Sequence, residues 1–193
     1  MESQFVTSES DLNTYLKQCS KCYKLTKNGT SIFSISSLHL LDINKVRTKK
    51  FALILNTKEK SDLGSIGHWI SVLVVKATRK IFIADSLTVA NNNTETSYRK
   101  LHEFCKQNGF KLYFFPVQTQ TSQSNTCGFQ TLFWIHVFHT MNLSQILTLR
   151  HPFYRFSVRN LQAFILTEVY KRLFKKYSYV KWCQHIVCLF LFL

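Results

Sequence analysis

Residues 128–141 are apolar on almost every side of a helix, and this run limits the possible folds more than any other stretch. A helix that is hydrophobic all round has to be buried on all sides, so we expect it at the centre of a domain. The chain has 193 residues, of which 46% are hydrophobic, and this is enough to build a core around such a helix. We therefore expect a single domain over residues 1–193, with residues 179–193 as a hydrophobic tail of unassigned structure.

Periodicity and cap signals predict the other elements. Ser8 and Asp11 are spaced as in a capping box at the start of an amphipathic first helix. Apolar runs with strand composition predict strands over 51–55, 69–75, 81–84 and 111–117, with a hairpin turn at 78–80. Helices are expected over 98–107 and 160–177. Residues 26–48 are polar and mixed, which favours a loop with one short helix.

Positive charge is concentrated in the second half of the chain. The formal net charge is +15, and residues 105–193 hold ten Lys or Arg against one acid, Glu168. Such a field attracts polyanions such as nucleic acid. On the predicted last helix, like charges one turn apart repel one another, and a bound polyanion would reduce this repulsion. The alternative is that these residues form an ordinary solvent-exposed face. The candidate polyanion-binding residues are Lys171, Arg172, Lys175 and Lys176.

The sequence context favours reduced thiols. The N-terminus lacks a basic segment followed by an apolar run, so no secretory signal is expected. The apolar stretch 186–193 is too short to span a bilayer. We therefore expect an intracellular protein that is not secreted and has no membrane span, and we do not expect its six cysteines to form a disulfide framework.

Two groups of residues have spacings that suit a metal. Cys19 and Cys22 form a C-x2-C pair, and His136 and His139 are one turn apart on the apolar helix. No second close cysteine pair follows, since the next candidates are spread along the tail: Cys183, His185 and Cys188. We expect ordinary thiols and structural or surface histidines, and no metal site.

Three residues have the types and positions that nucleophilic catalysis needs. His68 opens a predicted strand, Asp85 ends the next strand, and Cys127 stands between a polar loop and the apolar helix. A helix N-terminus and an imidazole base both favour the reactive thiolate. A carboxylate on the far ring nitrogen orients the imidazole. Gly128 would let a substrate carbonyl approach the backbone N–H groups closely.

The same residues resemble the adenovirus protease family. The similarity covers roughly residues 51–178, and its clear motifs lie in two blocks. One comprises Asn56-Thr57, Gly67-His68-Trp69 and a carboxylate seventeen residues after the histidine. The other is the loop from Gln120 to Gly128, in which a Gln stands seven positions before the cysteine and a Ser stands three before it.

The resemblance implies an α+β fold in which a central helix bears the nucleophile and packs on a mixed sheet with flanking helices. It implies that Cys127 attacks the scissile carbonyl, that His68 moves the proton and that Asp85 orients His68. Gln120 and the Cys127 backbone N–H would hold the oxyanion. Trp69 and Gly128 are candidates to line the substrate cleft. Gln118 and Gln123 compete with Gln120 if the loop aligns differently.

The chain departs from that family in two places. Asp85-Ser86-Leu87 is more similar to SUMO-specific proteases of the same clan, but those place their Gln six residues before the cysteine, where this chain has Thr121. The family's peptide activator is disulfide-linked at the position of Gly109, so covalent activation is not expected. No cofactor is required, and DNA or a short peptide remain possible activators.

The leading functional hypothesis is a viral maturation endopeptidase that cleaves capsid and core precursors. It would act as a monomer with non-specific DNA binding, in the virion and the interior of the host cell, the nucleus above all. One alternative is a SUMO- or ubiquitin-like-protein protease, for which the substrate would be a folded ubiquitin-like protein. The other is a catalytically silent, basic DNA-binding virion core protein, which would bind DNA without hydrolysing peptides.

Overall fold

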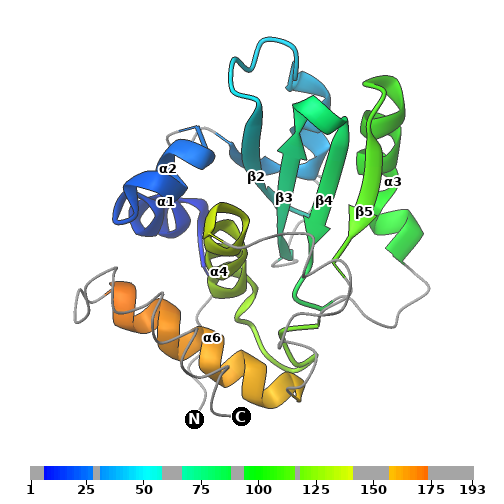
Figure 1. Ribbon diagram of the computed structural model, residues 1–193. Helices are drawn as coiled ribbons and strands as arrows, with labels where there is room; N and C mark the ends of the chain where they lie inside the picture. The colour runs from blue at the N-terminus through cyan, green and yellow to red at the C-terminus, as the bar shows by residue number, and fades with distance from the viewer. Residues whose placement is uncertain are drawn as a thin grey trace.

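A central five-stranded sheet organises the computed structural model (Figure 1). The structure describes residues 7–27, 31–57, 67–87, 94–115, 118–140 and 157–173. The strands lie side by side in chain order: β1 (Ile32–Ser34), β2 (Lys50–Asn56), β3 (Trp69–Val75), β4 (Lys80–Ala84) and β5 (Lys111–Phe114). The three central strands are antiparallel to one another, and β1 and β5 add to them in parallel. The sheet is therefore mixed, as expected for the α+β class.

Helices cover both faces of this sheet, which explains why the central strands are apolar without a break. Phe51, Leu53 and Leu55 face one side, where α3 (Thr94–Gln107) and the short 3-10 helix η1 (Ile35–Leu40) lie. Ala52 and Ile54 face the other side, beneath the remaining helices. Figure 1 shows α3 on one side of the sheet and α1, α2 and α4 on the other.

The predicted first helix and its cap are confirmed. Helix α1 spans Glu9–Lys17, and Ser8 is its N-cap residue. The Asp11 backbone N–H donates to Ser8 Oγ at 3.1 Å, and the Ser8 N–H donates to the Asp11 carboxylate at 2.9 Å. A second short helix, α2 (Ser20–Leu25), follows at once. Leu12 and Leu16 bury the inner face of α1 in the core.

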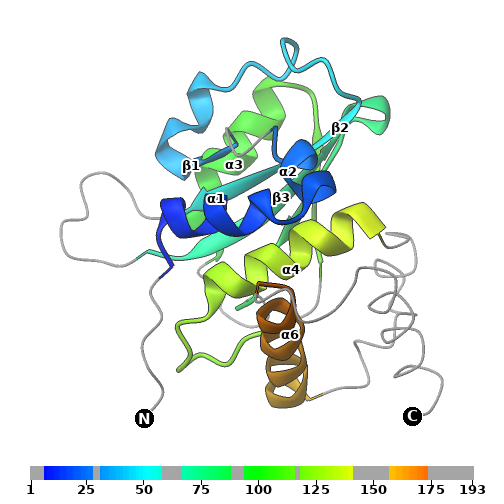
Figure 2. The same ribbon diagram turned by 90° about the vertical axis from the view of Figure 1, so that its left-hand side faces the viewer.

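The apolar helix is central, as its composition predicted. Helix α4 spans Cys127–Thr140, and it packs against β3, α6, α2 and α1. Figure 2 shows α4 running beside α1 and α2, with α6 (Val158–Leu173) against it. Side chains on every side of α4 are at most 2% exposed: Phe133, Trp134, Ile135, Val137 and Phe138. Because α4 is packed on all sides, the position of its first residue, Cys127, relative to the sheet is fixed.

Four boundary predictions need correction. Residues 26–48 contain a strand as well as a helical turn, because β1 pairs with β2 in parallel through Ile32–Ser34. Strand β5 ends at Phe114, short of residue 117, although the Phe115 N–H still donates to the Ile83 carbonyl at 2.8 Å. Helix α6 begins at Val158, two residues earlier than predicted, and helix α3 begins at Thr94, four residues earlier than predicted.

Several predictions fall on residues that the structure does not describe. These are residues 116–117 of the predicted strand, the end of the last helix at 174–177 and the tail at 179–193. Within the described ranges, none of the helices is both long enough and apolar enough to cross a bilayer.

Candidate active site

His68 is held at the entrance to β3. Its backbone N–H donates to Thr57 Oγ1 at 3.1 Å, and its carbonyl accepts from the Thr57 N–H at 2.8 Å. These bonds continue the β2–β3 ladder beyond Asn56. Gly67 has φ 71, in the left-handed region that favours glycine. The Gly-His-Trp motif thus turns the chain into β3 and fixes the position of the His68 backbone.

Asp85 lies at the same end of the sheet as His68. Strands β3 and β4 are antiparallel, with Ser71 opposite Ala84, so the entrance to β3 is beside the exit from β4. His68 Nε2 and Asp85 Oδ1 are 2.6 Å apart. Asp85 Oδ1 also accepts from the Leu87 N–H at 2.8 Å, and the Tyr98 hydroxyl from α3 donates to Oδ2. Both oxygens of this buried carboxylate are therefore engaged.

Cys127 is the first residue of α4 and meets the imidazole. Its thiol lies beside the His68 ring and near the backbone N–H groups of Trp69 and Gly128, and all three lower its pKa. Since Nε2 is on Asp85, Nδ1 is the ring nitrogen left for the thiol. One turn further along, the Thr131 carbonyl accepts from Ser71 Oγ at 3.2 Å. This bond fastens α4 to β3, the strand that follows His68.

Hydrogen bonding outweighs burial for both members of the pair. Burial alone would raise the pKa of Cys127, but the bonds from His68 and the backbone N–H groups lower it. Burial would lower the pKa of His68, but its bonds to Asp85 and Cys127 raise it to about 9. Both shifts favour the thiolate and imidazolium forms of the pair relative to an isolated thiol and imidazole. Burial alone would raise the pKa of Asp85. Its bonds, that from His68 first, lower this pKa by more in total, so the carboxyl group is ionised.

Gln120 is tied to the residue that follows Asp85. The N–H groups of Thr119 and Gln120 both donate to the Ser86 carbonyl at 2.9 Å. Ser86 Oγ donates to Gln120 Oε1 at 2.7 Å, and Gln120 Nε2 donates to the Ser124 carbonyl. The Gln120 residue is 1% exposed. A side-chain amide has two N–H groups, so Nε2 keeps one besides the bond to Ser124.

The two competing glutamines are held differently. Gln118 Nε2 donates to the Gln120 carbonyl at 2.9 Å, and Gln123 is exposed. Helix α6 supports the same loop, because Gln162 Oε1 accepts from the Thr121 N–H at 2.7 Å. Among these glutamines, Gln120 alone is buried. Its role at an oxyanion stays a prediction.

The two candidate cleft residues pack against the segment before α1. Trp69 is 8% exposed, and its indole N–H donates to the Thr7 carbonyl at 2.8 Å. A Cβ at Gly128 would lie 2.4 Å from the Thr7 Cβ. Glycine is thus needed here for the approach of Thr7, whatever its use toward a substrate. That either residue lines a cleft stays a prediction.

Sequence reasoning missed three residues that build this site. Tyr98 binds the acid from a helix on the opposite face, Ser86 holds Gln120, and Thr7 packs on Gly128. Ser86 had a signal, because it stands inside the Asp-Ser-Leu motif. Tyr98 and Thr7 had none, since only the fold brings their segments to the site.

The basic candidates are only partly described. Lys171 and Arg172 belong to the last turn of α6, whose side chains are not described, and Lys175 and Lys176 lie outside the described residues. Polyanion binding therefore remains a sequence-based prediction.

Comparison with known proteins gives likenesses of fold. No protein-family model matches the sequence, and no curated protein matches it significantly. The ASFV protease in selenomethionine form is 15% identical, with a TM-score of 0.47; the match covers 79% of this chain and 65% of that chain. The chain thus spans just under two thirds of that protein's length.

Two further solved structures give similar values. SUMO protease Ulp1, with its catalytic cysteine oxidised to a sulfenic acid, is 13% identical with a TM-score of 0.44, and 86% of this chain and 80% of that chain are covered. ChlaDub1 from Chlamydia trachomatis is also 13% identical with a TM-score of 0.44, and the coverages are 86% and 77%. Likenesses of this size do not assign an activity, which has to come from the geometry of the site.

Proposed function

We propose that this protein is a cysteine endopeptidase with Cys127 as nucleophile, His68 as acid and base, and Asp85 as the group that orients His68. The observation that carries this is the position of the His68 ring between Cys127, whose pKa it lowers, and Asp85 Oδ1, which lies 2.6 Å from His68 Nε2. A cysteine in this setting is a nucleophile at neutral pH. A carboxylate that also accepts from the Leu87 N–H and the Tyr98 hydroxyl cannot turn away from the ring.

The proposed reaction has two stages. The Cys127 thiolate forms a bond to the scissile carbonyl carbon, and the oxyanion binds the Cys127 backbone N–H and Gln120 Nε2. His68 then gives its proton to the leaving amine as the C–N bond breaks, which leaves a thioester on Cys127. A water molecule, deprotonated by His68, attacks the thioester and releases the acid product and the thiol.

Substrate class rests on the sequence resemblance. We propose that the substrates are precursor proteins of a virus, cleaved in the virion or the host cell interior, and that polyanionic DNA stimulates the enzyme through the basic half of the chain. A protease for folded ubiquitin-like proteins is the alternative. A capsid-type precursor peptide and a SUMO fusion, offered in parallel with and without DNA, distinguish the two.

The decisive experiment compares hydrolysis by wild type, Cys127→Ala and Cys105→Ala. Cys105 is a matched control, because it is buried on α3 away from His68 and burial raises the pKa of its thiol to about 12. We expect Cys127→Ala to lose activity by about 10⁴-fold or more, while Cys105→Ala keeps it. Hydrolysis that survives in folded Cys127→Ala would overturn the assignment, and binding of DNA without hydrolysis by any variant would favour the silent core protein.

A further inference from the structure

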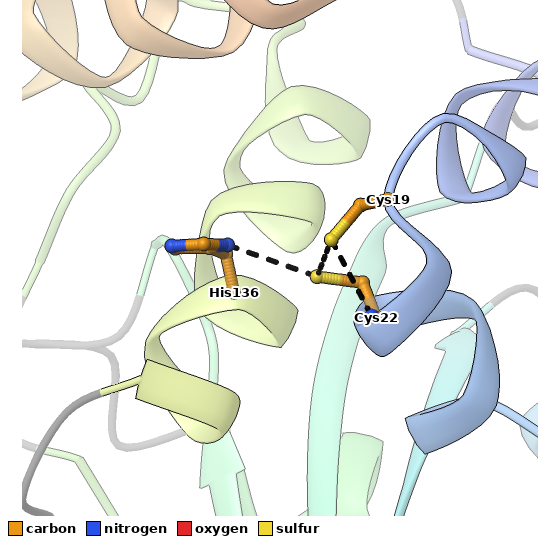
Figure 3. Close-up of side chains that lie close together, drawn as sticks. All are labelled: Cys19, Cys22 and His136. Carbon is orange, nitrogen blue, oxygen red and sulfur yellow. Dashed lines mark hydrogen bonds between the residues drawn. The ribbon is translucent and has the colours of Figure 1, made fainter. Parts of the chain in front are cut away.

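A second cysteine–histidine cluster lies further along α4. Cys19 is the N-cap of α2, Cys22 is in its first turn, and His136 projects from α4 toward them (Figure 3). The two sulfur atoms are 2.8 Å apart, and Cys22 Sγ is 3.7 Å from His136 Nδ1. All three potential ligand atoms lie within 4.8 Å of one another. No other group of three His, Cys, Asp or Glu in the described part of the chain is placed to hold a metal.

The donor set suits one class of metal ion. Two thiolates and an imidazole are ligands that Zn²⁺ prefers, and C-x2-C is a usual spacing for the first two. In a tetrahedral site with Zn–S near 2.3 Å and Zn–N near 2.05 Å, sulfur and nitrogen would be about 3.6 Å apart and the two sulfurs about 3.8 Å apart. The observed sulfur–nitrogen distance of 3.7 Å already fits. The sulfurs need to separate by about 1 Å, which the half-buried Cys19 can allow by rotation at the start of its helix.

Burial means that these thiols need a compensating charge once they are ionised. Cys22 and His136 are each 3% exposed, and Cys22 belongs to the same hydrophobic cluster as Leu16 and Ile135. Two thiolates in such surroundings would be costly by themselves. A divalent cation between them makes the group electrically neutral, and the protons leave to solvent when it binds.

We propose that Cys19, Cys22 and His136 bind a Zn²⁺ ion that ties α2 to the nucleophile helix. The ligands come from segments more than a hundred residues apart, so the ion would close a long loop as well as join two helices. Solvent or His139 supplies the fourth ligand. His139 is one turn further along α4; burial lowers its pKa, while the nearby Cys19 acts in the opposite direction.

The role of this ion is structural. The proposed site contains no carboxylate, and its one imidazole besides His136 is that of His139. His136 is nine residues from Cys127, about 13 Å along the helix axis. The ion therefore lies away from the reacting thiol. It would hold α1 and α2 against α4, the helix whose first residue carries the catalytic sulfur.

The experiment uses full-length reduced protein freed of metal. One equivalent of Zn²⁺ is added to wild type, Cys19→Ser, Cys105→Ala and Cys127→Ala, followed by buffer exchange, metal analysis and thermal unfolding. We expect one tightly held Zn²⁺ and a rise in Tm of about 5 °C or more in all proteins except Cys19→Ser. Before zinc is added, Cys19→Ser should unfold at the same temperature as wild type, because its side chain is half-buried and of similar size.

Co²⁺ locates the site. In wild type and Cys127→Ala we expect the intense visible bands of tetrahedral cobalt and a thiolate charge-transfer band, both lost or reduced in Cys19→Ser and in His136→Asn. Three outcomes would overturn the inference: reduced wild type takes up no metal, the bands survive in Cys19→Ser but vanish in Cys127→Ala, or a Cys19–Cys22 disulfide is recovered from protein prepared with zinc present. The first and last would leave the proposed peptidase untouched, and the second would place the metal at the active site.

Discussion

The two ends of α4 use the same residue types in different surroundings. At the first residue, Cys127 faces His68, and about 13 Å further along the helix axis, His136 faces Cys19 and Cys22. The difference lies in the third group. At the first end, a carboxylate holds the far nitrogen of the imidazole, at 2.6 Å, whereas a second thiol completes the other cluster.

This third group decides what each cysteine can do. In the proposed mechanism, Asp85 keeps His68 charged and oriented, and this makes the Cys127 sulfur a nucleophile. Two sulfurs beside one imidazole make a set of metal ligands instead. Cys105 shows the limiting case, because its thiol is buried with neither partner and burial raises its pKa to about 12. Environment, far more than residue type, separates the three kinds of cysteine.

The largest expected effect on activity comes from removing the Asp85 carboxylate, which distinguishes the two ends of α4. Asp85→Asn keeps the shape but presents an amide to His68 Nε2, which no longer steadies the imidazolium. We expect kcat/KM to fall by about 10²- to 10⁴-fold, while zinc uptake at the other end is unchanged. Steady-state kinetics and metal analysis on the same preparation check both halves, and a joint loss of activity and zinc would mean that the two ends are not independent.

A smaller loss is expected from the oxyanion candidate. Gln120→Ala removes the Nε2 donor and also the acceptor of Ser86 Oγ. We expect kcat to fall by about 10²- to 10³-fold, with little change in the alkylation rate of Cys127, because the nucleophile itself is intact. Gln123→Ala is the matched control on the same loop, since this side chain is exposed. Equal effects of the two changes would remove Gln120 from the mechanism.

The packing of the first turn of α4 gives the smallest expected effect. Gly128→Ala would bring a Cβ to 2.4 Å from the Thr7 Cβ, and we expect the free energy of unfolding to fall by about 1–3 kcal/mol. Thr7→Gly in the same chain should restore much of the loss by removing the opposing side chain. Denaturant unfolding of the three proteins measures this; a Gly128→Ala protein as stable as wild type would show that the segment before α1 does not pack there.

Much of the fold was predictable because both faces of the sheet are covered. The runs at 51–55 and 69–75 are apolar without a break, and they became β2 and β3 with bounds within one residue of the prediction. Strand β1 was missed because it has only three residues, Ile32–Ser34, and is stabilised by pairing with β2 rather than by its own pattern.

The grouping of the candidate site residues was predictable where each stands at a boundary between elements. His68, Asp85 and Cys127 stand at element boundaries that the sequence itself marks, and the structure brings the three together. Tyr98 reaches Asp85 from the helix on the other face of the sheet. The pair Cys19 and Cys22 had a visible spacing, but the partner that gives it meaning, His136, is 114 residues from Cys22. A local sequence pattern cannot show that residues so far apart in the chain lie side by side in the fold.

The most direct test of the account is alkylation of each cysteine across pH 5–9, measured peptide by peptide in wild type and His68→Ala. Because the pKa of Cys127 is lowered, it should react at a lower pH than an ordinary thiol does, and His68 should lose its proton only as the pH rises toward about 9. Cys105 should stay unreactive throughout. In His68→Ala, Cys127 should return to the dependence of an ordinary thiol, with a pKa of about 8.5. If Cys127 reacts in wild type as an ordinary thiol, or reacts identically without His68, the two residues do not form the proposed pair.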